Sequence, residues 1–176
     1  IQKFKDKTGP INIVEMRGTD GSSPTEGRSR GFRDILNTNP RFQIVRSETG
    51  DFLRSRGREL MEQLLEECAA TNTPIDVIYS HNDPMTFGIL ETLEKAGIQP
   101  GKDIVIVSID AEQAALDALA AGKINCVVEC NPHLGPQIIE LAKILAAGGT
   151  IPKITRVNET IFTENDDLKN LPQRGY

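Results

Sequence analysis

The sequence predicts an α/β protein built on a doubly wound parallel sheet with helices on both faces. Three observations support this fold class. Short aliphatic runs alternate regularly with segments of helical periodicity. Such alternation implies crossover connections, and these join parallel strands. The strand-like runs are aliphatic throughout rather than cleanly alternating, as expected for strands that are covered on both faces.

Two strand–helix pairs open the chain. Residues 11–16 form a short β-branched run ahead of a turn-rich stretch. Residues 24–38 carry a helical pattern that stops at an Asn-Pro pair. Residues 41–47 alternate like a strand. Residues 53–71 place four leucines on one face of a long helix, with charged residues opposite.

Two further pairs follow with the same spacing. Residues 75–80 are an aliphatic strand, and the helix expected at residues 84–96 ends at a glycine. Residues 103–110 are the most apolar strand of the chain. The helix expected at residues 111–121 also ends at a glycine.

One more pair and a closing strand complete the pattern. A strand is expected at residues 124–130, followed by a helix at residues 133–147 that stops at Gly-Gly. Residues 157–163 form the last expected strand, and a polar tail follows it.

Composition and charge argue against two classes of protein, those that bind nucleic acid and those that span a membrane. The chain has 176 residues, of which 38% are hydrophobic and 26% charged, as in a globular domain. Its net charge of −5 argues against a nucleic-acid partner. No apolar run approaches the roughly 20 residues needed to span a bilayer. The opening residues read as the end of a helix without an initiator Met, so the chain is expected to lack its original start.

Three cysteines, Cys68, Cys126 and Cys130, do not form a disulfide framework. Cys126 and Cys130 lie four residues apart on an expected strand, which places them on one face but about 13 Å apart. They are therefore not expected to bridge each other.

Polar and aromatic residues follow each expected strand, and all of them fall on one rim of the sheet. They are Gly18 to Ser23 with Arg28, then Asp51 with Phe52, His81 to Asp83, Asp110, and Glu129 to Pro132. Ligands of doubly wound sheets bind beyond the carboxyl ends of the strands. Carboxylates, amides, a guanidinium and a flat aromatic ring suit a neutral polyhydroxylated ring.

Each of these residues also has an ordinary structural interpretation. Asn82 or Asp83 could cap a helix with Pro84 in its first turn, and Asp110 could cap the next helix. Arg28 could be a solvated surface charge. The remaining alternatives are a core position for Phe52, a turn or surface position for His81, and a small buried hydrophobe for Cys130. The coincidence of all of them on one rim favours a binding site.

Motifs of catalysis do not occur in the sequence. It contains no GxxxxGK[ST], no GxGxxG after a strand, no GxSxG and no HExxH. The two histidines, His81 and His133, have no Cys or His partner at metal-binding spacing. Ser80 and His81 are adjacent on a strand and point to opposite faces, so they do not form a catalytic pair. Binding without chemistry, metal or cofactor is the simplest expectation.

Several segments resemble the type 1 periplasmic sugar-binding proteins, the ribose- and galactose-type solute-binding proteins of ABC importers. They are GRSRGFRDIL, TGDFLRSRG, YSHNDPMTFGILETLEKAG, IVIVSIDAEQAALDALAAGKI and VVECNPHLGPQIIELA. NPHLGP and the terminal Gly175-Tyr176 resemble the galactofuranose-binding branch in particular. The resemblance covers nearly the whole chain but matches only the second part of the family's two-lobed fold.

This resemblance implies a division of the chain. Residues 1–130 correspond to the carboxyl-terminal sugar-binding lobe. Residues 131–150 correspond to a crossing segment and a helix that packs on the other lobe. Residues 151–176 correspond to the return strand and the tail. Without the other lobe, the apolar face of helix 133–147 is expected to be free to form a homodimer.

The resemblance also implies site residues, carried over by position. They are Arg28, Phe52, Asn82, Asp110, Glu129 and Cys130. Cys130 stands where ribose binders carry Gln, a departure that argues against ribose. Glu129 beside it is expected to take over the contact.

A solute-binding protein of this type binds a monosaccharide, such as a galactofuranose-like aldose, and delivers it to the importer's membrane subunits. The implied location is periplasmic or extracellular. One alternative is the effector-binding domain of a lactose-repressor-type transcription regulator, which shares the fold and the Arg, Asn and Asp positions. Another is a small α/β enzyme acting on a sugar, but no base with an evident partner supports it.

Overall fold

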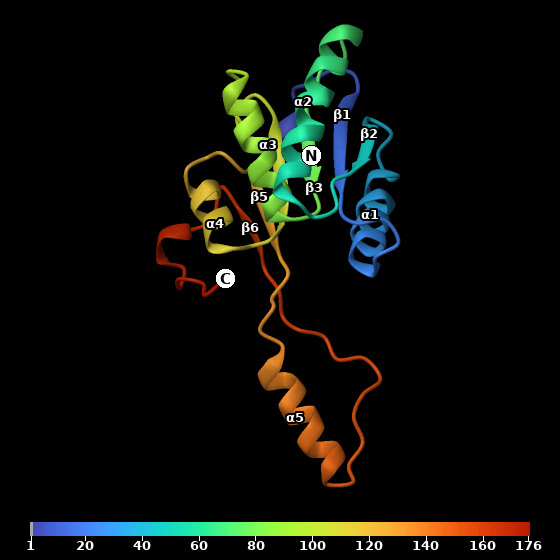
Figure 1. Ribbon diagram of the computed structural model, residues 1–176, viewed down its shortest axis with the longest axis vertical. Coiled ribbons are helices and arrows are strands. Elements are labelled where there is room, and N and C mark those ends of the chain that lie inside the picture. Colours follow the sequence, from blue (N-terminus) through green and yellow to red (C-terminus); the bar gives the residue numbers. More distant parts are fainter. Residues whose placement is uncertain (1) are drawn as a thin grey trace.

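The computed structural model describes residues 2–176, and these form a six-stranded sheet with the order β2-β1-β3-β4-β5-β6 (Figure 1). The strands are β1 (Ile11–Arg17), β2 (Phe42–Thr49), β3 (Val77–Ser80), β4 (Val105–Asp110), β5 (Cys126–Glu129) and β6 (Ile161–Thr163). The helices are α1 (Ser23–Leu36), α2 (Arg54–Thr71), α3 (Asp83–Lys95), α4 (Gln113–Ala120) and α5 (Gly135–Ala146). Short 3₁₀ turns, η1 (Gln2–Phe4) and η2 (Leu168–Asn170), lie near the two ends. The predicted order of elements is confirmed.

The prediction of a parallel sheet holds for β1 to β5 and is wrong for β6. Strand β6 pairs antiparallel with β5 and is shorter than the expected 157–163. The chain leaves the sheet at the carboxyl end of β5, passes through α5 and returns to the same end (Figure 1). A strand that enters from the carboxyl edge must run against its neighbour.

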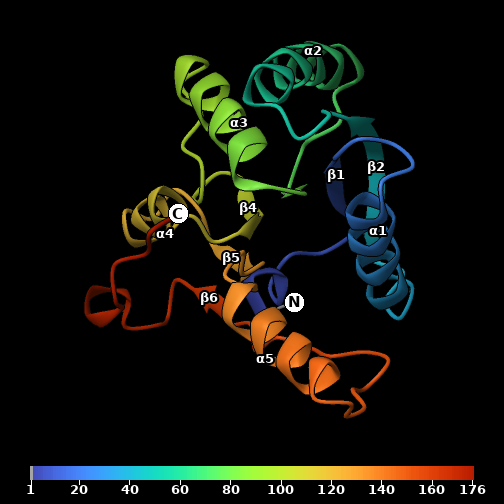
Figure 2. The same cartoon turned by 60° about the horizontal axis from the view of Figure 1, so that its bottom comes forward.

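The helices cover the two faces of the sheet unequally. The step from β1 to β2 runs opposite to the steps from β2 to β5, and right-handed crossovers therefore place α1 on one face and α2, α3 and α4 on the other. Figure 2 shows α1 apart from the α2–α4 layer. Two separate hydrophobic clusters result, one containing Ile78 and Ile106 under α2–α4, the other containing Val77 and Phe32 under α1.

Capping side chains start the helices that border the rim. The Ser22 side chain accepts a hydrogen bond from the amide of Thr25 at the start of α1. The Asn82 side chain does the same for Met85 at the start of α3. In both helices a proline occupies the first turn, where no backbone N–H is needed. The first turns of α1 and α3 are thereby set at the carboxyl ends of β1 and β3.

Helices α2 and α3 pack backbone to backbone, because each has a glycine at the contact. A Cβ atom on Gly88 would overlap the carbonyl oxygen of Arg54, and one on Gly57 would lie 2.9 Å from the Cα of Met85. At both glycines the nearest atoms belong to the backbone of the facing helix, so no flexible side chain could move aside to accommodate a Cβ.

Replacing Gly88 with alanine is expected to lower the free energy of unfolding by about 2 kcal/mol, because overpacking forces the two helix backbones apart. Urea denaturation measures this change. Gly31→Ala in α1 is the matched control: a Cβ there meets nothing within 4 Å, and it should leave stability unchanged or slightly raised. Equal stability of the two variants would contradict the close packing.

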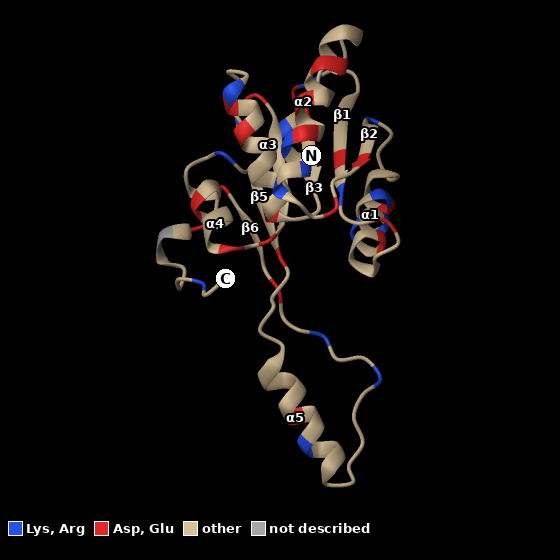
Figure 3. Ribbon diagram, in the orientation of Figure 1, with Lys and Arg blue, Asp and Glu red and all other residues tan. Residues whose placement is uncertain are grey.

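Helix α5 stands away from the sheet and from α1–α4 (Figure 1). None of its residues is buried, and large apolar side chains on and beside it are exposed, namely Leu134, Ile138, Ile139, Ile144 and Leu145. The helix carries only two charged residues, Glu140 and Lys143 (Figure 3). Of the helices in residues 2–176, none has the length and apolar character that crossing a membrane requires.

Candidate functional site

Arg28, Phe52 and Asp110 meet at the carboxyl rim of the sheet. Nη2 of Arg28 donates to Oδ1 of Asp110 at 2.9 Å, and both side chains are mostly buried, with 16% and 26% exposed. The Arg28 guanidinium also lies over the Phe52 ring, 5.7 Å from its centroid. Its other nitrogen, Nη1, donates to the carbonyl of His81. Residues from α1, the β2–α2 turn and the end of β4 therefore form one cluster.

Asn82 adjoins this cluster and also caps α3. Its Oδ1 accepts from the amide of Met85, and its Nδ2 donates to the carbonyl of Phe52 at 3.1 Å. The structural interpretation of Asn82 as a helix cap is confirmed. The side-chain amide of Asn82 also connects the turn at Phe52 to the start of α3 by a hydrogen bond. The capping residue is therefore part of the rim.

An unusual backbone presents Phe52. Both Asp51 and Phe52 have positive φ angles, 53° and 62°, which are uncommon for residues with side chains. The Phe52 ring lies directly over Gly18, where any Cβ would overlap it. Gly18 is thus needed for the ring to approach the first β–α turn. Phe52 contacts the hydrophobic core while it also faces Arg28.

A second strained turn presents Asp110. Its φ is 122°, and that of the following Ala111 is 65°. Burial raises the pKa of the Asp110 carboxyl, although the charge and hydrogen bond of Arg28 act to lower it. Backbone strain of this kind persists only where the surroundings hold it, and it is concentrated at functional sites.

Glu129 and Cys130 are placed differently from the other four predicted site residues. Glu129 is paired with Asp110 in the sheet register, but its Oε1 accepts from Arg174 at 2.8 Å and its Oε2 from the amide of Thr160 at 2.9 Å. Burial raises the pKa of Glu129, but the bonds from Arg174 and Thr160 outweigh it and lower the value. Cys130 is exposed, and its amide donates to the carbonyl of Asp110. The Glu129 side chain therefore binds the carboxyl-terminal segment through Arg174 and the returning chain through Thr160.

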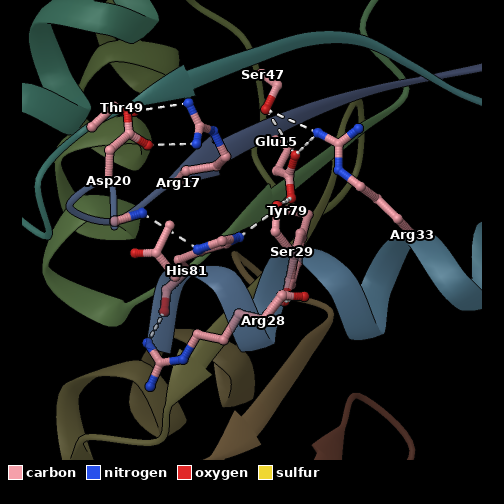
Figure 4. A network of polar contacts seen from close by, with 12 residues as sticks. Glu15, Arg17, Asp20, Arg28, Ser29, Arg33, Ser47, Thr49, Tyr79 and His81 are labelled. Carbon is pink, nitrogen blue, oxygen red and sulfur yellow. Dashed lines mark hydrogen bonds and ion pairs between the residues drawn. The ribbon is translucent and has the colours of Figure 1, made fainter. Parts of the chain in front are cut away.

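A buried polar network lies behind the rim, and the sequence-based expectations did not include it (Figure 4). Glu15 of β1 is fully buried and accepts hydrogen bonds from Ser29 at 2.5 Å and Ser47 at 2.8 Å. Arg33 forms an ion pair with the same carboxylate. The signal in the sequence was a charged residue between two apolar residues, Val14 and Met16, of a strand.

His81 joins this network: it lies in the turn between β3 and α3, as one interpretation expected, but it is fully buried, so a surface position is wrong. Its Nδ1 accepts from the amide of Gly18 at 3.3 Å, which leaves the proton on Nε2. Nε2 lies 3.4 Å from Oε1 of Glu15. Burial raises the pKa of Glu15, but the nearby His81 imidazole, the hydrogen bonds from Ser29 and Ser47 and the charge of Arg33 outweigh it and lower the pKa to about 2.

Asp83, the residue after the capping Asn82, is also fully buried. Its carboxylate accepts from the hydroxyl of Ser108 and from the amide of Glu112. Burial raises the pKa of Asp83 to about 7, against the opposing effect of these two hydrogen bonds. A helix cap or a ligand contact would leave the Asp83 carboxylate at the surface or at the rim. Neither role explains why it is fully buried.

The groups at the rim can form hydrogen bonds and apolar contacts. Among residues 2–176, no group of three or more His, Cys, Asp or Glu side chains is arranged to hold a metal ion. Within the described chain, Cys68, Cys126 and Cys130 are free thiols. Arg28 offers donors, Asp110 acceptors and Phe52 an apolar face, and the Arg28–Asp110 pair is neutral overall.

A family model described as "Periplasmic binding protein domain" matches residues 1–150. The chain belongs to the periplasmic binding protein family. The resemblance found in the sequence and the predicted fold class are thereby confirmed.

Curated relatives of this periplasmic binding protein domain bind sugars. The galactofuranose-binding protein YtfQ of Escherichia coli (strain K12) is 33% identical over 171 residues, which cover 95% of this chain and 54% of the relative. The ribose import binding protein RbsB of Bacillus subtilis (strain 168) is 31% identical over 150 residues, 84% of this chain and 46% of the relative. The chain spans about half the length of these relatives.

Solved structures give the same picture. A Mycobacterium smegmatis protein in complex with β-D-fucofuranose is 42% identical, with a TM-score of 0.87 over 96% of this chain and 54% of that one. The periplasmic binding component of an arabinose ABC transporter from Shewanella sp. ANA-3, bound to L-arabinofuranose, is 34% identical, with a TM-score of 0.84 over 93% and 54%. The comparisons do not support the repressor alternative.

Proposed function

We propose that this chain supplies one lobe of the sugar-binding component of an ABC importer, and that this component binds a neutral monosaccharide in its furanose form without chemistry. The observation that carries the proposal is the Arg28–Phe52–Asp110 cluster, with Asn82 beside it, at the carboxyl rim of a periplasmic binding protein domain. Relatives with bound fucofuranose and arabinofuranose support the furanose form.

The charge of the cluster supports a neutral ligand. Arg28 and Asp110 already neutralise each other at 2.9 Å, so a charged ligand would have to displace one partner of a largely buried pair. A sugar can instead accept from the guanidinium and donate to the carboxylate while the pair remains. The Phe52 ring, next to the guanidinium, offers an apolar face to the C–H groups of a sugar ring.

We assign residues 1–130 and 151–176 to the lobe that carries the site, and residues 131–150 to a crossing segment that reaches a second lobe. Exposed apolar side chains on α5 support this division, because water-exposed leucines and isoleucines at this density usually mark an interface. The membrane subunits of an importer are the proposed partners, and the proposed location is periplasmic or extracellular. A relative that is a ribose import binding protein supports these partners, and membership of the periplasmic binding protein family supports the location.

Calorimetry on the intact protein tests the proposed function. The panel consists of D-galactose, D-fucose, L-arabinose and D-ribose, with D-glucuronate as an acidic control. We expect a neutral sugar with an accessible furanose form to bind and the acid to bind far more weakly. Failure of every neutral sugar in the panel to bind would reject the proposal.

Replacing Asp110 with alanine is expected to weaken sugar binding about 10- to 150-fold, because a hydrogen bond to a charged group is lost. The substitution also leaves the mostly buried Arg28 without its counter-charge, so urea denaturation is measured alongside and only folded protein is titrated. Asp117→Ala, an exposed carboxylate on α4, is the matched control and should bind normally. Equal dissociation constants for Asp110→Ala and the unaltered protein would remove Asp110 from the site.

The 176-residue chain by itself is expected to self-associate through α5. Each exposed Leu or Ile left in water forgoes about 1.5–3 kcal/mol of burial free energy. Light scattering during size-exclusion chromatography should report a dimer that Ile138→Ser with Leu145→Ser returns to a monomer. A monomeric unaltered chain with a well-ordered, bare α5 would contradict the interface.

A further inference from the structure

Asp83 connects the start of α3 to the turn that carries Asp110. Its side chain is fully buried. Oδ1 accepts from the Ser108 hydroxyl at 2.5 Å, and Oδ2 accepts from the Glu112 amide at 2.8 Å. Glu112 is the residue directly after Ala111 and the N-cap of α4. A buried carboxylate from one helix start therefore reaches the start of the next helix, across the end of β4.

The turn that it reaches is strained. Asp110 and Ala111 are consecutive residues with side chains and positive φ angles, 122° and 65°. Such a pair is costly for L-residues and persists only when hydrogen bonds around it determine the conformation. The described bonds are those from the Glu112 amide to Asp83 and from the Cys130 amide to the Asp110 carbonyl. The Glu112 amide, at the N-cap of α4, donates to Asp83 at 2.8 Å.

The strain redirects the Asp110 side chain. Along β4, Ile106 and Ser108 face α2–α4, and regular alternation would turn Asp110 to that side as well. Its carboxylate instead meets Arg28, which belongs to α1 on the other face of the sheet. The positive-φ turn and the Arg28–Asp110 pair therefore occur together at the end of β4.

We infer that Asp83 is a positioning residue for ligand binding: its hydrogen bond to the Glu112 amide fixes the Asp110–Ala111 turn and so directs Asp110 toward Arg28 and the sugar. The inference rests on the proposed function. A carboxylate suits this position, because α3 begins at Asp83 and α4 just after Glu112, and helix starts favour an anionic acceptor. An amide oxygen can accept the same N–H, so asparagine should replace aspartate here.

Three variants of the intact protein test the role of Asp83 by calorimetry with D-galactose, D-fucose and L-arabinose. Asp83→Ala should weaken binding about 10-fold or more, since Asp110 loses its defined direction. Asp83→Asn should stay within about threefold of the unaltered protein, because the acceptor is retained. Thr86→Val is the matched control: it alters the same buried network through Ser108 but leaves the Glu112 bond intact, and it should also stay within about threefold.

A second readout is independent of any sugar. In the ligand-free protein, hydrogen exchange at the Glu112 and Gln113 amides should be faster in Asp83→Ala and normal in Asp83→Asn and Thr86→Val. If Asp83→Ala does not fold, Asp83→Ser serves instead, because it keeps a polar group in the buried network but lacks the carboxylate oxygen that accepts from Glu112.

The outcomes separate the two proposals. If the unaltered protein binds none of the sugars, the proposed function fails, while hydrogen exchange still decides whether Asp83 holds the turn. If sugar binds and a folded Asp83→Ala protein shows an unchanged dissociation constant, the positioning role is overturned. Equal losses in Asp83→Ala and Thr86→Val would also overturn it, since they would reflect general damage to the network.

Discussion

Replacing Arg28 with alanine is expected to weaken sugar binding at least about 100-fold, a larger loss than for any other single residue of the rim. One side chain makes three contacts there: it pairs with Asp110, donates to the His81 carbonyl and lies over the Phe52 ring. Its removal leaves the mostly buried Asp110 carboxylate without a counter-charge and deletes donors to the sugar. Calorimetry on the intact protein measures the dissociation constant.

Two further variants separate the effect of the guanidinium geometry from the effect of removing a positive charge on α1. Arg28→Lys keeps the charge but not the planar fork of donors, and it should bind with intermediate affinity. Arg30→Ala removes an exposed arginine two residues further along α1 and should bind normally. If Arg28→Ala and Arg30→Ala had the same affinity, Arg28 would not contact the sugar.

Replacing Glu15 with alanine is expected to lower the free energy of unfolding by about 3–5 kcal/mol. The substitution removes a fully buried acceptor of hydrogen bonds from Ser29 and Ser47, breaks the ion pair with Arg33 and leaves a small cavity in the sheet. Urea denaturation at neutral pH measures the change. Glu59→Ala, at an exposed position of α2, should stay within about 0.5 kcal/mol of the unaltered protein.

Glu15 should also set part of the acid sensitivity. Its pKa is about 2 in the folded protein against an ordinary value of 4.5, so the folded state binds its proton more weakly than the unfolded state does. The resulting stabilisation is fully present above about pH 4.5 and is lost as the pH falls toward 2. Unfolding curves between pH 2 and 6 should show a smaller decline for Glu15→Gln than for the unaltered protein. The same decline in both would rule out Glu15 as the titrating group.

Sequence patterns within each segment were sufficient to predict the order of strands and helices. Aliphatic strand runs, helical periodicity and the glycines and asparagines at helix ends depend on neighbouring residues, so their order identified five parallel strands and their helices. The rim site followed from topology, because parallel strands bring their carboxyl ends to one edge. The resemblance then implied Arg28, Phe52, Asn82 and Asp110 as site residues among those of the rim. The structure places these four in one connected group, and their contact with a sugar stays a prediction.

Contacts between residues far apart in the chain decided the rest. Glu129 was predicted to contact the ligand, which stays a prediction, and its carboxylate accepts a hydrogen bond from Arg174, 45 positions later, a partner that no local pattern indicated. The direction of β6 depended on where the chain re-enters the sheet.

The supporting layer of the site lay beyond local pattern for the same reason. Burial of Glu15 with His81, and of Asp83 against Glu112, joins elements that only the fold brings together. A buried carboxylate is stable only when distant donors converge on it, and positive φ at Asp110 persists only when distant bonds hold it. Hydrophobic periodicity indicates which face of a helix or strand is apolar. The conformations of Glu15, Asp83 and Asp110 depend instead on hydrogen-bond partners that come together only in the folded chain.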